Sequence, residues 1–523
     1  MLVPPPLQKD PPVGSIESIL SRSGECTIRA RTLMIQGTSS SVGKSVLTAA
    51  LCRIFARRGL RVAPFKAQNM ALNSFVTATG EEMGRAQVVQ AHAAGREPEI
   101  EMNPVLLKPE GDSRSQVVLM GRPWKTLSAG EYYTCREVLW SSVVSSFEKL
   151  AAENDLVLVE GAGSPAEINL RKSEIVNMRV AKTFGCPVLL AGDIDRGGVF
   201  ASLVGTLALL EEDERALVKG FLINKFRGDV KLLEPGLEML TDLTGGRPVL
   251  GVIPWLKNLA VAQEDSVYLD ENRGVAEKGD VDIAVIKLPR ISNYDDFDPL
   301  ALEDGVGLRF VDDPASLGHP DALILPGSKT TIGDLAWLRR TGFDGLIGAL
   351  ALAGSTVAGI CGGYQMLGRR IIDADGVEGS PSEVSGLGLL PGETVFEPAK
   401  ETSRVSGVTV PGPGFPGDFP LPVEGYEIHM GKTVLPEGAR PLVRLAGGRT
   451  DGAVSARGRV WGTYLHGIFD NSSFRGAWLR SLGWKGKDST ASFAEEREKA
   501  FDRLADEVEA SLDMAALERI IGL

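Results

Sequence analysis

Gly43, Lys44 and Ser45 form a Gly-Lys-Ser triplet whose chemistry suits a phosphate group. The triplet closes the stretch Gly-Thr-Ser-Ser-Ser-Val-Gly-Lys-Ser, which starts at Gly37 directly after an apolar run. Glycines let backbone N–H groups turn toward phosphate oxygens, and a helix that begins here presents its positive N-terminus. Lys44 would neutralise the phosphate oxygens, and the Ser45 hydroxyl would hold Mg²⁺. We therefore expect a nucleotide to contact Gly37, Thr38, Gly43, Lys44 and Ser45.

A metal-bound triphosphate also needs a carboxylate, and Glu160 is the candidate. It follows the apolar run 156–159 and precedes Gly161, which would put it at the carboxyl edge of a sheet, where ligands gather. The alternative is a strand-end acid that faces water. Further polar side chains follow predicted strands and are candidates for the nucleotide, the metal or a substrate: Lys66, Gln68, Asn69, Asp193, Asp195 and Asn224. Asn224 could read a base with its amide, or it could cap a turn.

Cys361 stands where a nucleophile would stand. It follows the apolar run 356–360 and precedes two glycines and a predicted helix. A tight turn between strand and helix exposes a side chain beside backbone N–H groups, and the helix N-terminus would lower the thiol pKa. The N–H of Gly362 and an N–H near Gly327 could form an oxyanion hole. A small buried hydrophobic residue is the other fate of a free cysteine, and we assign the remaining four cysteines to it.

A cysteine nucleophile needs a base, and the chain has four histidines. His92 belongs to the first half of the chain, and His319 precedes a proline in a predicted loop. His466 ends an apolar strand in the same half as Cys361, so we choose it as the base. His429 is the runner-up.

The elements that must position these residues form two α/β series. Short, continuous apolar runs alternate with helix-length segments, which indicates parallel strands covered on both faces. The stretch 410–422 is rich in glycine and proline and predicts an exposed excursion. The predicted parts are an extension at 1–29, a phosphate-loop domain at 30–256, a polar linker at 257–280, a second α/β domain at 281–488 and a helical tail at 489–523.

Composition excludes several functional classes. The net charge is −12 and no long basic run occurs, which argues against non-specific binding of nucleic acid. The five cysteines form no Cys-x-x-Cys pair, which fits a reducing cytosol. No run of eighteen apolar residues could span a membrane, and the proline-rich start does not resemble a signal peptide. We therefore expect a cytoplasmic protein, while its oligomeric state stays open.

Several motifs carry a resemblance to known families. "GICGGYQ" around Cys361 resembles the glutaminase half of class I glutamine amidotransferases. The phosphate loop has five residues between its glycines and resembles the dethiobiotin-synthetase type of P-loop protein. "FKAQNMALNSFVT", "EGAGSPAEINL", "DIDRGGVFAS", "INKFRGD", "GYEIHMG" and "YLHGIFD" together resemble the cobyric acid synthases of cobalamin biosynthesis. The likeness runs from about residue 32 to the C-terminal helix.

The resemblance implies a reaction and roles for residues. The reaction would be amidation of the b, d, e and g carboxylates of adenosylcobyrinic acid a,c-diamide, with ATP, Mg²⁺ and glutamine. Cys361 would be the nucleophile and His466 the base, and the glutamine site would include Gly327, Gly362 and Gln365. Many triad amidotransferases carry His-x-Glu, but Ile468 stands in the Glu position here. Three groups could then orient His466, namely Asp470, Glu427 or a backbone carbonyl.

Three rival functions share part of this pattern. A cobyrinic acid a,c-diamide synthase has both domain types, and a CTP-synthase-like amidotransferase has the same domain order. A non-catalytic P-loop switch ATPase would need neither Cys361 nor His466.

Overall fold

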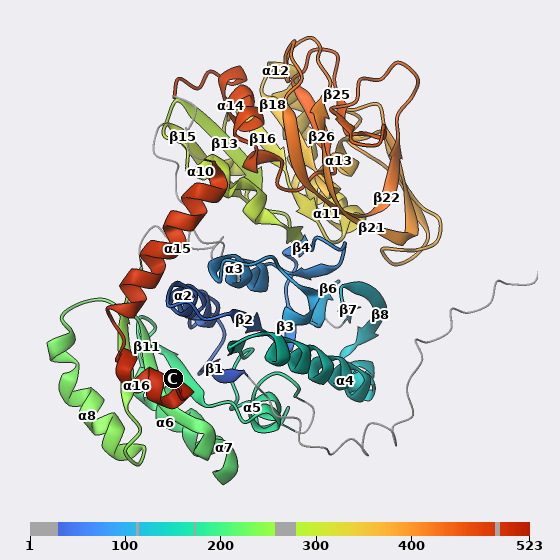
Figure 1. Cartoon of the computed structure of the whole chain (residues 1–523). Helices are drawn as coiled ribbons and strands as arrows, with labels where there is room; N and C mark the ends of the chain where they lie inside the picture. The colour runs from blue at the N-terminus through green and yellow to red at the C-terminus, as the bar shows by residue number, and fades with distance from the viewer. Residues whose placement is uncertain (1–29, 111–113, 172–173, 257–278, 487–491) are drawn as a thin grey trace, which may run out of the picture.

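The computed structural model of the chain describes residues 30–110, 114–171, 174–256, 279–486 and 492–523. The predicted extension at 1–29 and all but the end of the predicted linker lie outside these residues. Two α/β domains follow one another along the chain (Figure 1), as the alternation of apolar runs indicated. None of the helices within the described ranges combines the length and the apolar character that a membrane crossing requires.

The first domain is built on a parallel six-stranded sheet. Its strands, in spatial order, are β12 (Val249–Pro254), β11 (Val218–Phe226), β10 (Val188–Asp193), β1 (Arg31–Gly37), β9 (Leu156–Glu160) and β2 (Val62–Phe65). Successive residues of β1 enter different cores: Met34 packs with Phe65 on one face, and Leu33 packs with Phe55 on the other. Both faces are therefore covered, which explains the continuous apolar runs of a parallel sheet.

Helices and two small sheets surround this central sheet. The helices are α2 (Lys44–Arg57), α3 (Arg85–Ala93), α4 (Ala129–Glu153), α5 (Met178–Phe184), α6 (Val199–Leu209), α7 (Glu212–Leu217) and α8 (Glu234–Leu243). One small sheet contains β3 (Gln68–Met70), β6 (Val105–Pro109), β7 (Arg114–Leu119) and β8 (Arg122–Ser128). The other is the hairpin β4 (Ser74–Val76) and β5 (Glu82–Gly84). This hairpin lies at the boundary with the second domain, next to α3 (Figure 1).

The second domain has its own largely parallel sheet, in which only the edge pair β25–β26 is antiparallel. In spatial order its strands are β15 (Val306–Val311), β13 (Val281–Ile286), β16 (Ala322–Leu325), β18 (Thr356–Ile360), β26 (Val460–Thr463) and β25 (Ala453–Val454). A long antiparallel pair, β21 (Glu393–Thr409) and β22 (Pro422–Val434), stands beside it. Shorter elements at the sheet edge carry the site: η3 (Tyr294–Phe297), α10 (Asp298–Ala301), β17 (Gly327–Ser328), α11 (Thr331–Thr341), α13 (Gly362–Leu367) and η5 (Ile468–Asp470).

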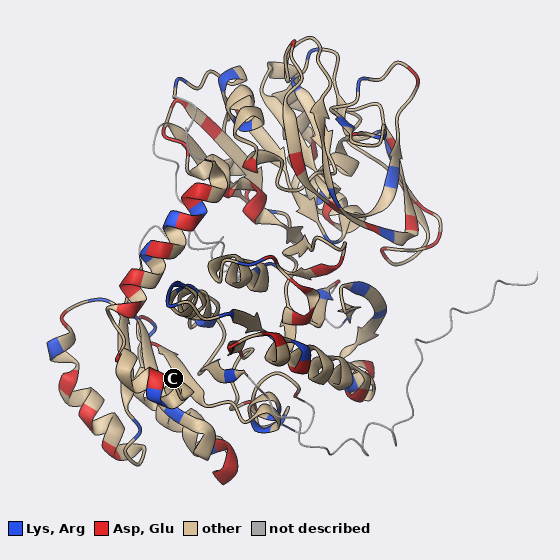
Figure 2. Cartoon of the chain, in the orientation of Figure 1, with Lys and Arg blue, Asp and Glu red and all other residues tan. Residues whose placement is uncertain are grey.

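The predicted helical tail consists of two helices, α15 (Phe493–Glu509) and α16 (Met514–Ile521), and it returns to the first domain (Figure 1). Phe501 lies in the same core as α2. Arg53 of α2 pairs with Asp502 at 2.8 Å and with Glu498 at 2.9 Å. Acidic and basic residues are interspersed along α15 (Figure 2). The helix contacts the sheet through its apolar residues and α2 through ion pairs. The end of the chain therefore packs on the beginning of the fold.

The glycine- and proline-rich stretch 410–422 is less exposed than its composition predicts. Phe415 is buried, and its ring packs 5.1 Å from that of Phe474 and 5.7 Å from that of Trp461. Phe419 is exposed, as predicted for the stretch as a whole. One aromatic anchor thus fastens this excursion to the second domain.

Candidate active sites

The Gly-Lys-Ser stretch lies between β1 and α2, at the carboxyl edge of the first sheet. Gly43 has a φ of +96°, and a Cβ atom there would come 2.2 Å from Nδ2 of Asn224. Only glycine fits, because the backbone is left-handed and the space is filled. Asn224 donates from Nδ2 to the carbonyl of Val42 at 2.8 Å. Its amide therefore holds the loop, which matches the turn role considered from the sequence, and Asn224 also lines the cavity where a base reader would lie.

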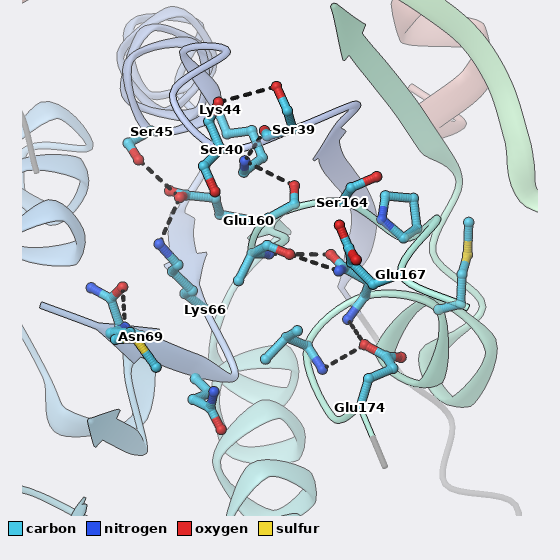
Figure 3. Close-up of a pocket in the computed structure, with 18 of the residues that line it drawn as sticks. Ser39, Ser40, Lys44, Ser45, Lys66, Asn69, Glu160, Ser164, Glu167 and Glu174 are labelled. Carbon is cyan, nitrogen blue, oxygen red and sulfur yellow. Dashed lines mark hydrogen bonds and ion pairs between the residues drawn. The ribbon is translucent and has the colours of Figure 1, made fainter. Parts of the chain in front are cut away.

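Glu160 is the centre of a polar cluster beneath this loop (Figure 3). Ser45 Oγ donates to Glu160 at 2.8 Å, Lys66 Nζ lies 2.9 Å from it, and Gln90 donates to its other oxygen. Glu160 is 1% exposed. Burial opposes its charge, but Lys66, Gln90 and Lys44 together outweigh burial and lower the pKa of the carboxyl. A charged carboxylate beside a serine hydroxyl is a set of hard oxygen donors, which fits Mg²⁺.

The Lys44 ammonium folds back over the loop, where it donates to the carbonyls of Ser39 at 3.0 Å and Gly163 at 3.1 Å. A lysine held among backbone carbonyls above a cavity is placed to meet an anion. Thr38 donates its N–H to Ala191 of the next strand at 2.9 Å. Thr38 and Gly37 are not among the residues that line the cavity, in contrast to Lys44 and Ser45.

A cavity of about 1320 Å³ opens in front of this cluster. Ligand pockets commonly have about 300–1,000 Å³, so this space suits a nucleotide together with a second large molecule. Lys66, Gln68 and Asn69, which were predicted as substrate contacts, line it. Sequence reasoning missed other lining residues, including Arg136, Arg171, Arg179, Lys225 and Trp255.

Asp193 and Asp195 lie in ion pairs beside this cavity. Asp193 pairs with Lys225 at 3.0 Å and accepts the N–H of Asp195 at 2.9 Å. Asp195 pairs with Arg227 at 3.0 Å. Neither carboxylate is part of the cavity lining, although both were predicted as candidates for substrate contact.

Cys361 occupies a strained turn between β18 and α13, with φ +51° and ψ −107°. A non-glycine residue in this region is held there by its surroundings, and such strain concentrates at functional sites. A Cβ atom at Gly363 would come 1.9 Å from the carbonyl oxygen of Leu325, so the chain after Cys361 can approach β16 only as glycine. The Cys361 side chain is 7% exposed and its sulfur lies 3.7 Å from the carbonyl of Ile428.

His466 lies beside this thiol, with Cys361 within hydrogen-bonding reach of its ring. Its Nδ1 lies 2.7 Å from Oδ2 of Asp296, whose other oxygen accepts the N–H of Gly467 at 2.8 Å. Burial alone would lower the pKa of His466, but Asp296 and Cys361 together raise it to about 10. Asp296 thus orients the imidazole, and Asp296 and Cys361 together keep it charged.

Asp296 is the orienting group that sequence reasoning missed. Of the groups considered, Glu427 is paired with Arg449 at 3.0 Å. Burial raises the pKa of Asp470 to about 7, and the ring nitrogen of His466 contacts Asp296. The acidic run at 295–298 was the one available signal, and nothing in its spacing connects it to a histidine 170 residues later.

His429, the runner-up base, lies in the same region with a different role. Its Nδ1 lies 2.9 Å from the carbonyl of Gly431, and its ring stacks on Tyr464 with centroids 3.8 Å apart. Burial lowers the pKa of His429 to about 4, so the ring is neutral. His466 rather than His429 therefore has the carboxylate partner expected of a base.

A second, smaller cavity of about 90 Å³ lies at this thiol. A Cβ atom on Gly362 would come 2.9 Å from the N–H nitrogen of Ser328, and one on Gly327 would come 3.3 Å from Cε1 of His466. Neither glycine is among the residues that line this cavity, whereas Ser328 is. Gln365 lines the cavity and donates to the hydroxyl of Tyr464 at 3.2 Å. Lys108 and Glu110 of the first domain complete the lining, so this cavity borders on both domains.

Comparison with known proteins assigns each domain to a family. Residues 33–267 match the model of the CobQ/CobB/MinD/ParA nucleotide binding domain, and residues 282–474 match that of the CobB/CobQ-like glutamine amidotransferase domain. These matches fit a chain that hydrolyses glutamine and forms amides.

Relatives match over almost the whole chain. A cobyric acid synthase of Dehalococcoides mccartyi (strain CBDB1) is 52% identical over 501 residues, which cover 94% of this chain and 99% of the relative. That of Sorangium cellulosum is 53% identical over 520 residues, again 94% of this chain and 99% of the relative. That of Moorella thermoacetica is 52% identical over 507 residues, or 94% and 98%. With such identity over both domains, the chain belongs to the cobyric acid synthase family.

Proposed function

We propose that the chain amidates the b, d, e and g carboxylates of adenosylcobyrinic acid a,c-diamide, with ATP as activator and glutamine as nitrogen donor. The observation that carries the proposal is the presence of two complementary sites in one chain. One site has the Cys361 thiol beside the His466–Asp296 pair. The other has a Gly-Lys-Ser loop above the buried Glu160. A switch ATPase would leave the first of these sites without a purpose.

In the glutaminase domain, Cys361 gives its proton to His466 before glutamine reacts, so the pair rests as thiolate and imidazolium, and the thiolate attacks the side-chain amide carbon of glutamine. The N–H groups of Gly362 and Ser328 stabilise the oxyanion. His466 returns the proton to the leaving nitrogen, so ammonia departs and a glutamyl thioester remains. Water then hydrolyses the thioester to glutamate and regenerates the thiol. Asp296 keeps Nδ1 of the imidazole bound throughout, which fixes the ring for both proton transfers.

In the synthetase domain, a corrinoid carboxylate takes the γ-phosphoryl group of ATP and becomes an acyl phosphate. A carboxylate is a poor electrophile, because oxide would have to leave; phosphate leaves readily. Ammonia from the other domain then displaces phosphate and gives the amide. Lys44 and Lys66 neutralise phosphate oxygens. Ser45 and Glu160 would hold Mg²⁺, which supplies charge neutralisation during phosphoryl transfer.

The cavity in the first domain supports a large second substrate. Its volume of about 1320 Å³ exceeds what a nucleotide alone requires. Arg136, Arg171 and Arg179 lie along its lining and suit a substrate with several carboxylates. We also propose that the protein works in a reducing cytosol, because the four cysteines within the described residues carry free thiols.

The products decide between this function and its nearest rival. Adenosylcobyrinic acid a,c-diamide, incubated with ATP, Mg²⁺ and glutamine, should give four successive carboxylate-to-amide changes by mass spectrometry. No change with this substrate, together with two changes on cobyrinic acid, would instead identify an a,c-diamide synthase.

Cys361→Ser should reduce the rate of glutamine-dependent amidation by about 1,000-fold or more, because the hydroxyl is a far weaker nucleophile in this site. Amidation with added ammonium should continue, since the nucleotide site is intact. Cys135→Ser is the matched control, because Cys135 lies on α4 away from the thiol site, and it should behave like the parent. If ammonium fails to restore synthesis in a folded Cys361→Ser protein, the division of labour is wrong.

Glu160→Gln should impair the synthetase site and leave the glutaminase site active. Amidation should fall by about 100-fold with glutamine and with ammonium alike, because a charged metal ligand is lost. The Mg²⁺ concentration for half-maximal amidation should rise, while glutamate release from glutamine persists. Unchanged Mg²⁺ dependence would remove Glu160 from the metal site.

Asp296→Asn should lower kcat for glutamine hydrolysis by about 100-fold and change its pH profile. Asp296 and Cys361 raise the pKa of His466 to about 10, so in the parent the imidazolium persists through neutral pH and is lost near pH 10. The variant has a lower pKa, so the alkaline fall in rate should begin at lower pH. A profile of glutamate release against pH measures this, and an unshifted alkaline limb would contradict the assignment of Asp296.

A further inference from the structure

The boundary between the domains contains a buried hydrogen-bond network next to His466. Asn293 donates its N–H to the side chain of Asn73 at 2.8 Å, and its own side chain accepts the N–H of Ser74 at 3.1 Å. Tyr426 donates to the carbonyl of Ser74 at 3.2 Å and accepts from Nδ2 of Asn293 at 3.1 Å. Asn73 and Ser74 belong to the synthetase domain and Asn293 and Tyr426 to the glutaminase domain, so each domain satisfies polar groups of the other.

Asn293 is the residue on which η3 starts, and it has a left-handed backbone with φ +54°. A non-glycine residue keeps this conformation when its surroundings hold it, and here the bonds to Asn73 and Ser74 do so. The next turn carries Asp295 and Asp296 side by side. The position of the carboxylate that orients His466 therefore depends on a turn anchored by the synthetase domain.

The two carboxylates of η3 have partners in different domains. Asp296 bonds to His466, whereas Asp295 lies 2.8 Å from Nε of Arg85, the first residue of α3. Both aspartates are at least 95% buried. Two adjacent buried carboxylates cannot both remain charged without a cation, because one would take up a proton. Arg85 is the cation that forms an ion pair with Asp295.

Aromatic packing provides a second link to the same histidine. The Tyr426 ring stacks on His466 at 5.3 Å and meets the Phe75 ring at 4.8 Å. The Arg85 guanidinium lies 5.3 Å from the centre of Phe75. The hairpin β4–β5 thus backs the face of Tyr426 that His466 does not occupy.

We propose that Arg85, with Asn73, is a positioning residue for glutamine hydrolysis, so that the synthetase domain completes the glutaminase site of its neighbour. The inference rests on the proposed function, in which Cys361 and His466 act on glutamine. Arg85 touches neither substrate nor thiol; it acts through Asp295 and the η3 turn. An undocked glutaminase domain would keep Cys361 and His466 and lose the cation that holds their supporting turn.

The effect of losing Arg85 also depends on the other charged groups around η3. Burial raises the pKa of Asp298 on α10 and of Asp470 on η5, and both carboxyls face Asp295 and Asp296. Arg497 of α15 acts on Asp470 and is repelled by Arg85. Burial and the charge of Asp296 raise the pKa of Asp295, and the Arg85 guanidinium opposes that rise, so loss of Arg85 leaves the buried Asp295 carboxylate without its cation. An unpaired charge on Asp295 would disturb the turn that holds Asp296, so the loss of rate should be largest at high pH, where Asp295 is charged.

The test compares Arg85→Gln, the double variant Arg85→Gln/Asp295→Asn, and Arg404→Gln as control. Arg404 crosses the same boundary and lies 5.2 Å from the centre of Phe75, but it pairs with Glu97 rather than with η3. Steady-state glutamate release, its pH profile and ammonium-dependent amidation are measured for each full-length protein.

Arg85→Gln should lower kcat for glutamine hydrolysis by about 10- to 100-fold with a smaller change in KM. The loss should be smaller at low pH, where Asp295 takes up a proton, and ammonium-dependent amidation should persist. The double variant should recover most of the lost kcat at high pH, because the unpaired carboxylate is gone. Arg404→Gln should resemble the parent.

Two results would overturn the inference. One is normal hydrolysis by Arg85→Gln. The other is an equal loss in all three variants that includes ammonium-dependent amidation, which would mean that the interface is merely structural. Loss of hydrolysis in Cys361→Ser tests the proposed function separately, so the two ideas can fail independently.

Discussion

The buried hydrogen bond between Asp296 and His466 is the interaction on which the rest of the glutaminase site depends. A thiol becomes a nucleophile only when a base takes its proton, and a buried imidazole remains charged only beside a carboxylate. The structure supplies that carboxylate from η3, at one edge of the second sheet, and the histidine from the end of β26. The strained turn at Cys361 then places the sulfur against the ring. Each of these elements contributes one group, and none forms a site alone.

The same helix reaches both active sites. Arg85 begins α3 at the η3 carboxylates, and Gln90 on that helix donates to Glu160 beneath the phosphate loop. Arg85 and Gln90 are five residues apart, which is a rise of about 7.5 Å, so fewer than two turns of one rigid helix separate the two clusters. In the proposed mechanism ammonia must arrive unprotonated at the activated carboxylate, and the thiol cavity borders on the synthetase domain through Lys108 and Glu110. The domain contact therefore belongs to the chemistry as well as to the fold.

Local patterns in the sequence were sufficient to predict the two-domain α/β fold, the phosphate loop and the turn at Cys361, because each is encoded by neighbouring residues. Contacts between distant segments were not accessible. The partner of His466 was sought at Asp470 or Glu427, whereas Asp296 comes from a turn that Asn73 of the other domain anchors. The helical tail was recognised from its apolar spacing, but its return to α2 depends on ion pairs that no single segment reveals. The burial of Phe415 could not be predicted either, because the composition of its stretch indicates exposure.

The protonation state of the His466 ring tests this account most directly. The chain has four histidines, so ¹⁵N-labelled imidazole signals can be assigned by substituting each histidine in turn. In the intact protein the account requires both ring nitrogens of His466 to carry protons at neutral pH, with titration near pH 10. A neutral ring at pH 7 that titrates at or below the ordinary histidine pKa of about 6.5 would contradict it.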